Sequence, residues 1–578
     1  MQRNPALSMI VFTIMLLSGA FLPAPALCLS PGEHCAHAAE QADPSGQQYN
    51  VSPTASDSSS SVCYEVFVRS FYDSNADGIG DLKGLMQSLD YINDGDRFSD
   101  TDLDCDMLWL MPVFPSPTYH KYDVTDYCAI DPSYGSMEDF DQLLSRCHER
   151  GVRVILDLPL NHTSTSHPWF IQAADYLRSL AAGTVPSVEE CPYIDYYHFS
   201  DAPADGSVPL EGSDWYYEAR FWSGMPDLDL DSPAVRDEIK AILRFWLEKG
   251  VDGFRLDAVT SYYTDNEQAN IAFLSWLNAA VKDIRPEAYL VGEAWTSVQT
   301  YARYYASGID SLFDFSFAGQ EGVIAGIARG TAPASRYGER LMEEEALFAE
   351  YSASAVNAPF YTNHDMARSA GYYARDGEPR VKLAQALNLL MPGQAFLYYG
   401  EEFGMKGSGK DENKRAPMYW TDDPSASCLC DGPPDMDEVK MKYPSWEEQS
   451  GDPFSILSYV KQAIRLRRNY PAIAKGCTQM IEPLSGKEVC TLLRTADGTD
   501  PVLLVINTSD TAQTVDLSAG GGETELFTQL AAQLHVSRNA AFLMATPAGG
   551  ILTLPPFGIA VLTQANAGRL TDSLCILD

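Results

Sequence analysis

Short apolar runs and amphipathic helical stretches alternate along most of the chain, beginning at Cys63. This alternation is typical of repeated βα units, which build a parallel sheet covered by helices. Eight apolar runs are predicted to be strands, namely Tyr64–Val68, Met107–Met111, Val152–Leu158, Gly253–Leu256, Tyr289–Val291, Leu312–Phe315, Phe360–Thr362 and Phe396–Tyr399. Eight strands with helices between them predict a (β/α)8 TIM barrel of the α/β class, whose active site lies at the carboxyl ends of the strands.

Two segments depart from the barrel pattern. About 70 residues separate Asn161 from a helix predicted to begin near Pro233, which is far longer than an ordinary βα loop. Residues 163–232 are therefore predicted to form a small inserted domain after the third strand, and the barrel takes residues 62–162 and 233–471. The insert is rich in aromatic residues, which suit a carbohydrate cleft or a compact core, with packing the expected role of any single one. They are Trp169, Tyr193, Tyr196, Tyr197, Trp215, Tyr216, Tyr217 and Trp222.

The second departure begins after about Pro471. Helical periodicity gives way there to alternating segments such as Val502–Ile506 and Ile559–Leu562, with Gly-rich turns between them. Residues 472–578 are therefore predicted to form a C-terminal antiparallel β-sandwich domain.

The first residues are typical of an export signal. Arg3 precedes the apolar run Met9–Leu22, and Ala24–Ala26 offers small residues for cleavage, so residues 1–26 are predicted to be a signal peptide. The apolar run is shorter than the roughly 20 residues that span a bilayer.

The next segment adds to the expectation of export. Residues 27–61 are rich in Ser, Ala and Pro and are predicted to be a disordered linker, and Cys28 is a candidate for lipid attachment. Twelve cysteines fit an oxidising compartment, and Cys477 with Cys490 is a candidate disulfide. The protein is expected to be extracellular or held at the cell surface.

Composition and charge exclude several classes of protein. The chain has 578 residues, 45% of them hydrophobic, which excludes a wholly disordered or collagen-like protein. With 40 Lys plus Arg against 79 Asp plus Glu, the net charge of -39 repels polyanions, so nucleic acid is not an expected partner. The sequence indicates no obligate protein partner and leaves the oligomeric state open.

Chemistry is first indicated at the end of the fourth predicted strand, in Gly253–Val259. Arg255 and Asp257 lie two residues apart and therefore on one side of the strand, where the arginine keeps the carboxylate ionised. An ionised, oriented Asp at the mouth of a barrel is what a nucleophile for an anomeric carbon requires. A structural ion pair is the alternative.

A second acid, Glu293, follows the next strand among apolar neighbours that should raise its pKa and keep it protonated for general acid work. Adjacent strands would hold the two carboxyl groups about 5 Å apart, the separation of retaining glycosidases. A capping role for Glu293 is the alternative. Asp365 follows the seventh predicted strand, where it would stabilise positive charge, and His364 beside it would donate hydrogen bonds to sugar hydroxyls.

Together and in this order, these segments resemble the conserved regions of the α-amylase family, glycoside hydrolase family 13. They are Asp157–His162, Gly253–Val259, Glu293 and Asn363–Asp365, with Met225–Asp229 resembling an additional region of the group intermediate between α-amylases, oligo-1,6-glucosidases and neopullulanases. The resemblance implies a retaining glycoside hydrolase with Asp257 as nucleophile, Glu293 as acid/base and Asp365 as the residue that fixes the distorted sugar. It further implies substrate-binding roles for four residues, Tyr122, His162, Arg255 and His364.

Metal binding has a separate signal in the loop from Asp73 to Asp81, which matches positions one, three, five, six, seven and nine of an EF-hand loop. Oxygens of Asp73, Asn75, Asp77, Asp81 and the carbonyl of Ile79 are predicted to surround a structural Ca²⁺. A metal-free Asx turn is the alternative. A second calcium beside Asn161 is in doubt, because Ser261 stands where many α-amylases carry a histidine.

Substrate choice within the family rests on a few positions. Tyr119-His120 resembles endo-acting α-amylases, whereas exo-acting oligo-1,6-glucosidases tend to carry an acidic residue there. Against this, Thr260-Ser261 replaces the Lys-His typical of many α-amylases. The resemblance therefore implies an exported α-amylase-like endohydrolase of α-1,4 bonds in starch and maltodextrins. The alternatives are a cyclomaltodextrinase, an oligo-1,6-glucosidase, a glucan transferase, or a non-catalytic carbohydrate-binding or transporter-associated relative.

Overall fold

The computed structural model describes residues 62–374, 377–522, 524–538 and 550–564. The predicted signal peptide, Cys28 and the predicted linker lie outside these residues. Among the described helices, none combines the length and the apolar character that a membrane span requires.

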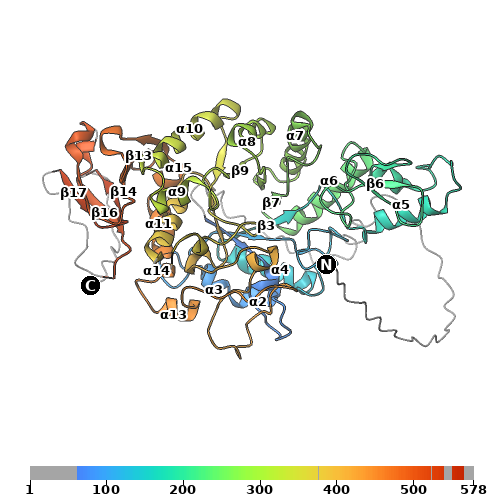
Figure 1. Ribbon diagram of the computed structural model, residues 1–578, viewed down its shortest axis with the longest axis horizontal. Coiled ribbons are helices and arrows are strands. Elements are labelled where there is room, and N and C mark those ends of the chain that lie inside the picture. The colour runs from blue at the N-terminus through green and yellow to red at the C-terminus, as the bar shows by residue number, and fades with distance from the viewer. Residues whose placement is uncertain (1–61, 375–376, 523, 539–549, 565–578) are drawn as a thin grey trace, which may run out of the picture.

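The centre of the molecule is a parallel sheet that curls into a nearly closed barrel (Figure 1). Its order is β10-β9-β8-β7-β3-β2-β1-β11, and the gap between the two end strands is bridged by hydrogen bonds from Gln394 N to Asn357 O and from Phe396 N to Pro359 O, both 2.8 Å. The strands are β1 Val62–Val66, β2 Met107–Leu110, β3 Arg153–Leu158, β7 Gly253–Leu256, β8 Tyr289–Gly292, β9 Ser311–Phe313, β10 Val356–Ala358 and β11 Ala395–Tyr398. The predicted TIM barrel is confirmed.

The seventh strand is the one that the sequence prediction misplaced. It was expected at Phe360–Thr362, but β10 covers Val356–Ala358. Pro359 has no N–H to donate to a ladder, so regular pairing ends before it. Phe360 is nevertheless only 2% exposed, because it packs in the barrel interior with residues such as Phe313. The apolar character of Phe360 therefore reflects its burial beyond the end of β10 and does not indicate strand structure.

Helices cover the outside of the barrel, and local sequence fixes their ends. Ser136 caps α4 in a capping box with Asp139, and α6 begins with Pro233 after the cap Ser232 and ends at Gly250, which has a left-handed φ of 110°. The helices are α2 Leu82–Gln87, α3 Leu89–Ile92, α4 Met137–Glu149, α6 Pro233–Lys249, α7 Glu267–Ile284, α8 Val298–Tyr304, α9 Val323–Arg329, α10 Ser335–Tyr351, α11 Glu378–Leu389, α12 Asp411–Lys414, α13 Trp446–Ser450, α14 Ile456–Asn469 and α15 Ala472–Lys475.

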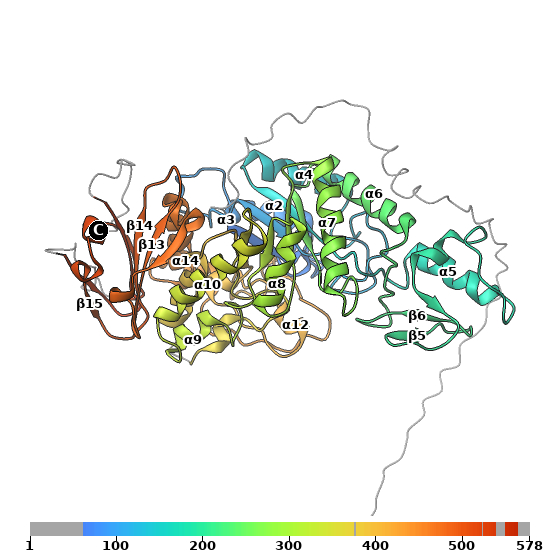
Figure 2. The same cartoon turned by 90° about the horizontal axis from the view of Figure 1, so that it is seen from above.

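The segment between β3 and α6 forms a small unit at one end of the molecule (Figures 1 and 2). It holds α5 Pro168–Ser179 and a sheet of order β4-β6-β5, made of β4 Phe199–Ser200, β5 Ser207–Pro209 and β6 Tyr216–Glu218. Most of its aromatic residues are core, as expected, and Tyr196 is fully buried. Phe221 and Trp222 are exposed, at 49% and 52%.

A C-terminal antiparallel β domain lies at the opposite end (Figure 2). Its five-stranded sheet has the order β12-β13-β14-β18-β16, and a two-stranded sheet pairs β15 with β17. Leu503, Leu552 and Leu562 belong to the apolar core between the two sheets. The strands are β12 Cys477–Met480, β13 Val489–Thr495, β14 Val502–Asn507, β15 Gln513–Asp516, β16 Gln529–Leu534, β17 Ile551–Leu554 and β18 Ile559–Thr563.

The candidate disulfide in this domain was wrong. Cys477 and Cys490 are both free thiols, the first exposed and the second buried. The register explains why: Cys477 on β12 lies opposite Thr495 at the far end of β13, whereas Cys490 stands near the start of β13. Thiols at opposite ends of a strand pair cannot meet without moving the backbone.

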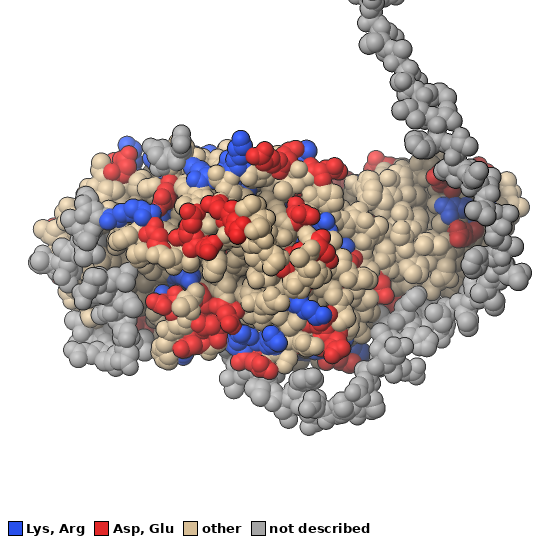
Figure 3. All heavy atoms as spheres, turned by 90° about the horizontal axis from the view of Figure 1, so that it is seen from below, with Lys and Arg blue, Asp and Glu red and all other residues tan. Residues whose placement is uncertain are grey.

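Acidic and basic side chains are interspersed on the face shown in Figure 3, with extended red patches of Asp and Glu. This agrees with the excess of 79 acidic over 40 basic residues in the sequence.

Candidate active site

One buried arginine organises the carboxyl ends of three neighbouring strands. Arg255, on β7 and 1% exposed, donates from Nη1 to Asp157 Oδ1 at 2.8 Å and to Asp257 Oδ1 at 2.6 Å. Its Nη2 donates to Glu293 Oε2 at 2.7 Å. Because β3, β7 and β8 are parallel and adjacent, their ends bring these side chains to one edge of the barrel. Because the two terminal nitrogens of one guanidinium hold Asp257 and Glu293, the two carboxyl groups lie side by side, as the acid pair of a retaining glycosidase must.

The surroundings of Glu293 raise its pKa. Burial, together with the negative charges of Asp257 and Asp365, raises the pKa of Glu293 to about 7, although Arg255 lowers it. The backbone N–H of Ala258, 3.3 Å away, also faces Glu293 Oε2. Ala258 has a left-handed φ of 41°, which is strained for a residue with a side chain, and this turn directs its N–H toward Glu293 just after Asp257. In its protonated form Glu293 can act as a general acid, and Asp257, bound to the same Arg255, can act as a nucleophile.

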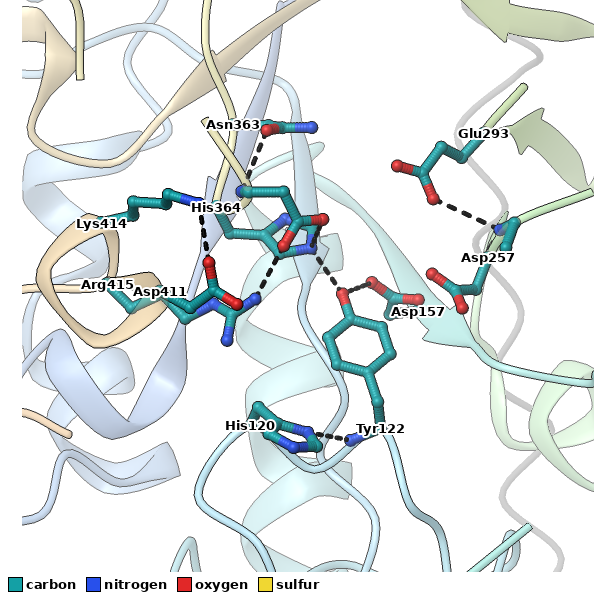
Figure 4. A network of polar contacts seen from close by, with 12 residues as sticks. His120, Tyr122, Asp157, Asp257, Glu293, Asn363, His364, Asp411, Lys414 and Arg415 are labelled. Atoms are coloured by element: carbon teal, nitrogen blue, oxygen red, sulfur yellow. Dashed lines mark hydrogen bonds and ion pairs between the residues drawn. The ribbon is translucent and has the colours of Figure 1, made fainter. Parts of the chain in front are cut away.

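A chain of hydrogen bonds crosses the barrel mouth from Asp157 to the opposite side (Figure 4). Tyr122 Oη donates to Asp157 Oδ2 at 2.9 Å and lies 2.7 Å from His364 Nε2. The Tyr122 and His364 rings are stacked, with centroids 5.7 Å apart and planes inclined by 16°. Burial raises the pKa of Asp157 to about 6 despite Arg255, and it raises the pKa of Tyr122, so the phenol keeps its proton.

His364 and Asp365 form an ion pair, His364 Nε2 to Asp365 Oδ2, at 3.1 Å. Arg415, which follows α12, donates from Nη2 to Asp365 Oδ1 at 2.8 Å and from Nη1 to the Tyr119 hydroxyl at 3.2 Å. Although burial opposes it, the positive His364 and Arg415 hold the pKa of Asp365 well below its usual range. Asp365 is therefore an anion with both oxygens engaged, and its side chain is still 30% exposed toward the site.

Two further histidines line this region. His162 is 2% exposed, and neither ring nitrogen has a hydrogen-bond partner among the described residues. A buried imidazole with both nitrogens free is costly unless a ligand satisfies it, which is what a sugar hydroxyl would do. His120 accepts from the Tyr122 backbone N–H at 3.1 Å, and burial lowers its pKa to about 4, so it is neutral.

Hydrogen bonds and ion pairs thus join six of the seven sequence-predicted catalytic and substrate-binding residues into one network. The seventh, His162, lies at the start of the inserted segment, where its backbone forms an isolated β-bridge with Asp227. Sequence reasoning missed Glu65, which accepts from His364 Nδ1, and Arg415. A charged residue inside the apolar run Tyr64–Val68 was a signal for Glu65; Arg415 stands in a loop without periodicity and gave none.

Aromatic side chains extend the site beyond Glu293. Trp295 is 55% exposed and stacks on Phe315, with ring centroids 5.1 Å apart and an interplanar angle of 21°. Phe221, from the inserted segment and 49% exposed, lies 5.4 Å from the His162 ring. Flat exposed rings beside a polar site suit the apolar faces of sugars.

The loop from Asp73 to Asp81 has the inner hydrogen bonds of an EF-hand. Asp73, 2% exposed, accepts from the backbone N–H groups of Asn75, Ala76 and Gly78, and Asp77 accepts from Ile79 N. Gly78 has a φ of 85°, and a Cβ there would lie 2.3 Å from an Asp431 oxygen, so the sixth position requires glycine.

The donor set of this loop fits a hard cation. Within the described residues no three His, Cys, Asp or Glu side chains group as a metal site, but the EF-hand pattern draws on Asn75 and the carbonyl of Ile79 as well as on Asp73, Asp77 and Asp81. Such carboxylate, amide and carbonyl oxygens are what Ca²⁺ prefers.

Asn161, at the doubtful second calcium position, contacts a carboxyl group of the inserted segment. Asn161 Nδ2 donates to Asp227 Oδ1 at 3.0 Å, beside an open pocket of about 230 Å³ that Ser261 also lines. Burial raises the pKa of Asp227 to about 6.

Comparisons with known proteins agree with this geometry. The family profile described as "Alpha amylase, catalytic domain" matches residues 65–476, and that of the D-apionate lactonase C-terminal immunoglobulin-like domain matches residues 488–562. Alpha-amylase 3 of Dictyoglomus thermophilum is 39% identical over 440 residues, covering 73% of this chain and 79% of that protein. Among solved structures, Eubacterium rectale Amy13B is 46% identical with a TM-score of 0.83, covering 88% of this chain and 96% of that one. An α-amylase from H. orenii is 31% identical with a TM-score of 0.74, covering 87% and 99%.

Proposed function

Because the chain belongs to the α-amylase family of glycoside hydrolases, we propose that it is an exported endohydrolase of α-1,4-glucosidic bonds in starch and maltodextrins. The observation that carries the proposal is the Arg255 guanidinium, which binds Asp257 through one terminal nitrogen and Glu293 through the other. Two carboxyl groups held on one guanidinium, with the pKa of Glu293 raised to about 7, support a retaining double displacement.

In the first step of this mechanism, an Asp257 oxygen attacks the anomeric carbon and forms a glycosyl ester. The bond from that carbon to the leaving oxygen breaks, and the Glu293 proton passes to the leaving oxygen. In the second step, the Glu293 carboxylate takes a proton from water, the hydroxide attacks the same carbon, and Asp257 is released. Asp365, an anion held by His364 and Arg415, would stabilise the positive charge of the sugar in both steps.

Internal cleavage requires room for sugars on both sides of the reacting bond. The exposed Trp295, two residues beyond Glu293, supports binding on the leaving-group side. On the other side of the reacting bond, Tyr119 stands in place of an acidic residue, which supports a cleft that stays open to further sugars. Its neutral hydroxyl accepts a hydrogen bond from Arg415 at 3.2 Å. A cyclomaltodextrinase, an oligo-1,6-glucosidase and a glucan transferase share the same catalytic groups and remain the alternatives; the intact set of three acids disfavours a non-catalytic relative.

Two further elements complete the proposal. The sequence of residues 1–26 supports export, and the loop from Asp73 to Asp81 supports a structural Ca²⁺ that holds the start of α2 next to the segment containing Asp431. Asp81 itself caps α2 by accepting from Gly84 N at 2.8 Å, so an ion there would link the loop to the barrel helix without touching the reacting atoms.

A product profile tests the substrate assignment. Purified protein is given soluble starch, maltoheptaose, a cyclodextrin and isomaltotriose in parallel, with Asp257→Asn as the blank. Rapid loss of starch chain length with mixed short maltooligosaccharides as products is expected. Activity confined to isomaltotriose or cyclodextrin would move the protein to the alternatives, and inactivity on all four would contradict the enzyme assignment.

A further inference from the structure

A buried carboxylate lies behind the site, on the strand where the barrel begins. Glu65 on β1 is 1% exposed, and its Oε1 is 2.6 Å from His364 Nδ1. Of the groups that would meet the sugar, it contacts His364, which stands between it and Tyr122 and Asp365. The mechanism above gives Glu65 no role, although a buried carboxylate is costly to retain.

The hydrogen bonds around His364 fix where its protons lie. The Tyr122 hydroxyl has one proton and gives it to Asp157 Oδ2, so the oxygen of Tyr122 accepts from His364 Nε2, which must carry a hydrogen. Asp365 Oδ2 is also an acceptor for this nitrogen. On the other side, the hydrogen-bond partner of Nδ1 is the Glu65 carboxylate. A ring that donates from both nitrogens is an imidazolium.

Carboxyl groups from several strands surround His364. Glu65 lies on β1, Asp157 on β3, Glu293 follows β8, and Asp365 is the next residue in the chain. The edge of the Trp109 ring on β2 closes another side, with centroids 5.7 Å apart. Although burial alone lowers it, Asp365 and Glu65 raise the pKa of His364 to about 10. Of these groups, only Glu65 binds Nδ1.

We propose that Glu65 is a positioning residue that keeps His364 doubly protonated and fixes its ring plane, so that Nε2–H is permanently directed at Tyr122, Asp365 and the sugar. This inference rests on the proposed function, because it assigns His364 to substrate binding. The mechanical reason is that a neutral imidazole could carry its single hydrogen on either nitrogen, and only the Nε2 form serves the site. Glu65 removes that choice.

The test uses histidine labelled with ¹⁵N in the full-length protein. The His364 ring signals are assigned by their loss in His364→Gln, and the remaining histidines, of nine in the chain, serve as internal references. In the wild type, both ring nitrogens of His364 are expected to remain protonated up to pH 8.5. In Glu65→Gln, the midpoint of its titration is expected to fall by about two pH units, because one opposite charge in contact is gone.

Activity gives the second readout. At pH 6, Glu65→Gln is expected to lower kcat on maltoheptaose about 10- to 100-fold with a smaller change in KM, since loss of the carboxylate behind a functional histidine releases its orientation. Glu65→Asp keeps the charge and should retain an imidazolium signal close to that of the wild type, with part of the activity restored.

Glu402→Gln is the matched control. Glu402 is also fully buried and contacts β1, where it accepts from Tyr64 Oη at 2.7 Å, but it does not touch His364. Glu402→Gln should leave the His364 titration unchanged. A wild-type His364 signal that is neutral at pH 8 would overturn the proposal even if Glu65→Gln failed to fold, and so would a folded Glu65→Gln that titrates as the wild type does.

The two readouts separate the two proposals. If the wild type cleaves no α-glucan but the His364 titration depends on Glu65, the proposed function fails and the positioning role stands. If starch is cleaved but the titration ignores Glu65, only the positioning role fails.

Discussion

Replacing Glu293 with glutamine isolates the general acid. In the structure, Glu293 Oε2 accepts from Arg255 and faces Ala258 N, and a glutamine oxygen can keep both contacts. The amide lacks only the ionisable proton. The variant therefore tests proton transfer at nearly constant shape.

The pKa of Glu293 sets the expected size of the effect. Since this pKa is raised to about 7, the acid form is present below pH 7 and lost above it. Wild-type kcat/KM on maltoheptaose should therefore fall about tenfold between pH 6 and pH 8. In Glu293→Gln, that alkaline limb should vanish, and kcat/KM at pH 6 should be lower by roughly 10²- to 10⁴-fold.

The assay compares two leaving groups. Fluoride leaves as an anion without a proton, so kcat/KM for α-maltotriosyl fluoride, which reports the first step, should fall less than about tenfold in Glu293→Gln. Asp257→Asn should lose both substrates, because the nucleophile is needed for each. An alkaline limb near pH 7 that persists in Glu293→Gln, or equal losses on both substrates, would refute the assignment of Glu293.

Three further predictions concern the metal, the cleft and the C-terminal domain. Chelation should lower Tm by a few °C in the wild type but not in Asp73→Ala, measured by calorimetry at constant pH; equal shifts in both would place the ion elsewhere. Trp295→Ala should raise KM for maltoheptaose roughly tenfold. The control is Phe98→Ala, which should leave KM unchanged because Phe98 is 85% exposed on a loop away from the barrel mouth. A KM of Trp295→Ala equal to that of the wild type would exclude Trp295 from the cleft. Leu503→Ala should cost about 2–5 kcal/mol, because Leu503 is fully buried between the C-terminal sheets, and should appear as a lower denaturant midpoint with kcat retained; an unchanged midpoint would contradict this packing.

The barrel and the three candidate acids could be predicted because Asp257, Glu293 and Asp365 each follow closely after an apolar run. Asp257 and Glu293 follow β7 and β8, and parallel strands deliver such residues to the same edge. The alternation of strand side chains likewise placed Arg255 on the same side as Asp257.

What could not be predicted depends on contacts between distant segments. Arg415 reaches Asp365 from a loop 50 residues later in the chain, and no local pattern encodes that approach. Glu65 is satisfied by His364, 299 residues away, so its place in an apolar run became meaningful only with the fold. Phe360 misled the strand prediction because burial at a strand end produces the same apolar signal as the strand.

The central claim is that Asp257 forms a covalent bond to the sugar. A maltosyl fluoride with fluorine at C5 of the reacting sugar slows both steps, and the fluoride leaving group lets the intermediate form faster than it hydrolyses. Peptide mapping by mass spectrometry then locates the sugar. The account predicts one adduct per chain, on the peptide containing Asp257, and none in Asp257→Asn. An adduct on Glu293 or Asp365, or turnover that yields the β-anomer first and no adduct, would contradict it.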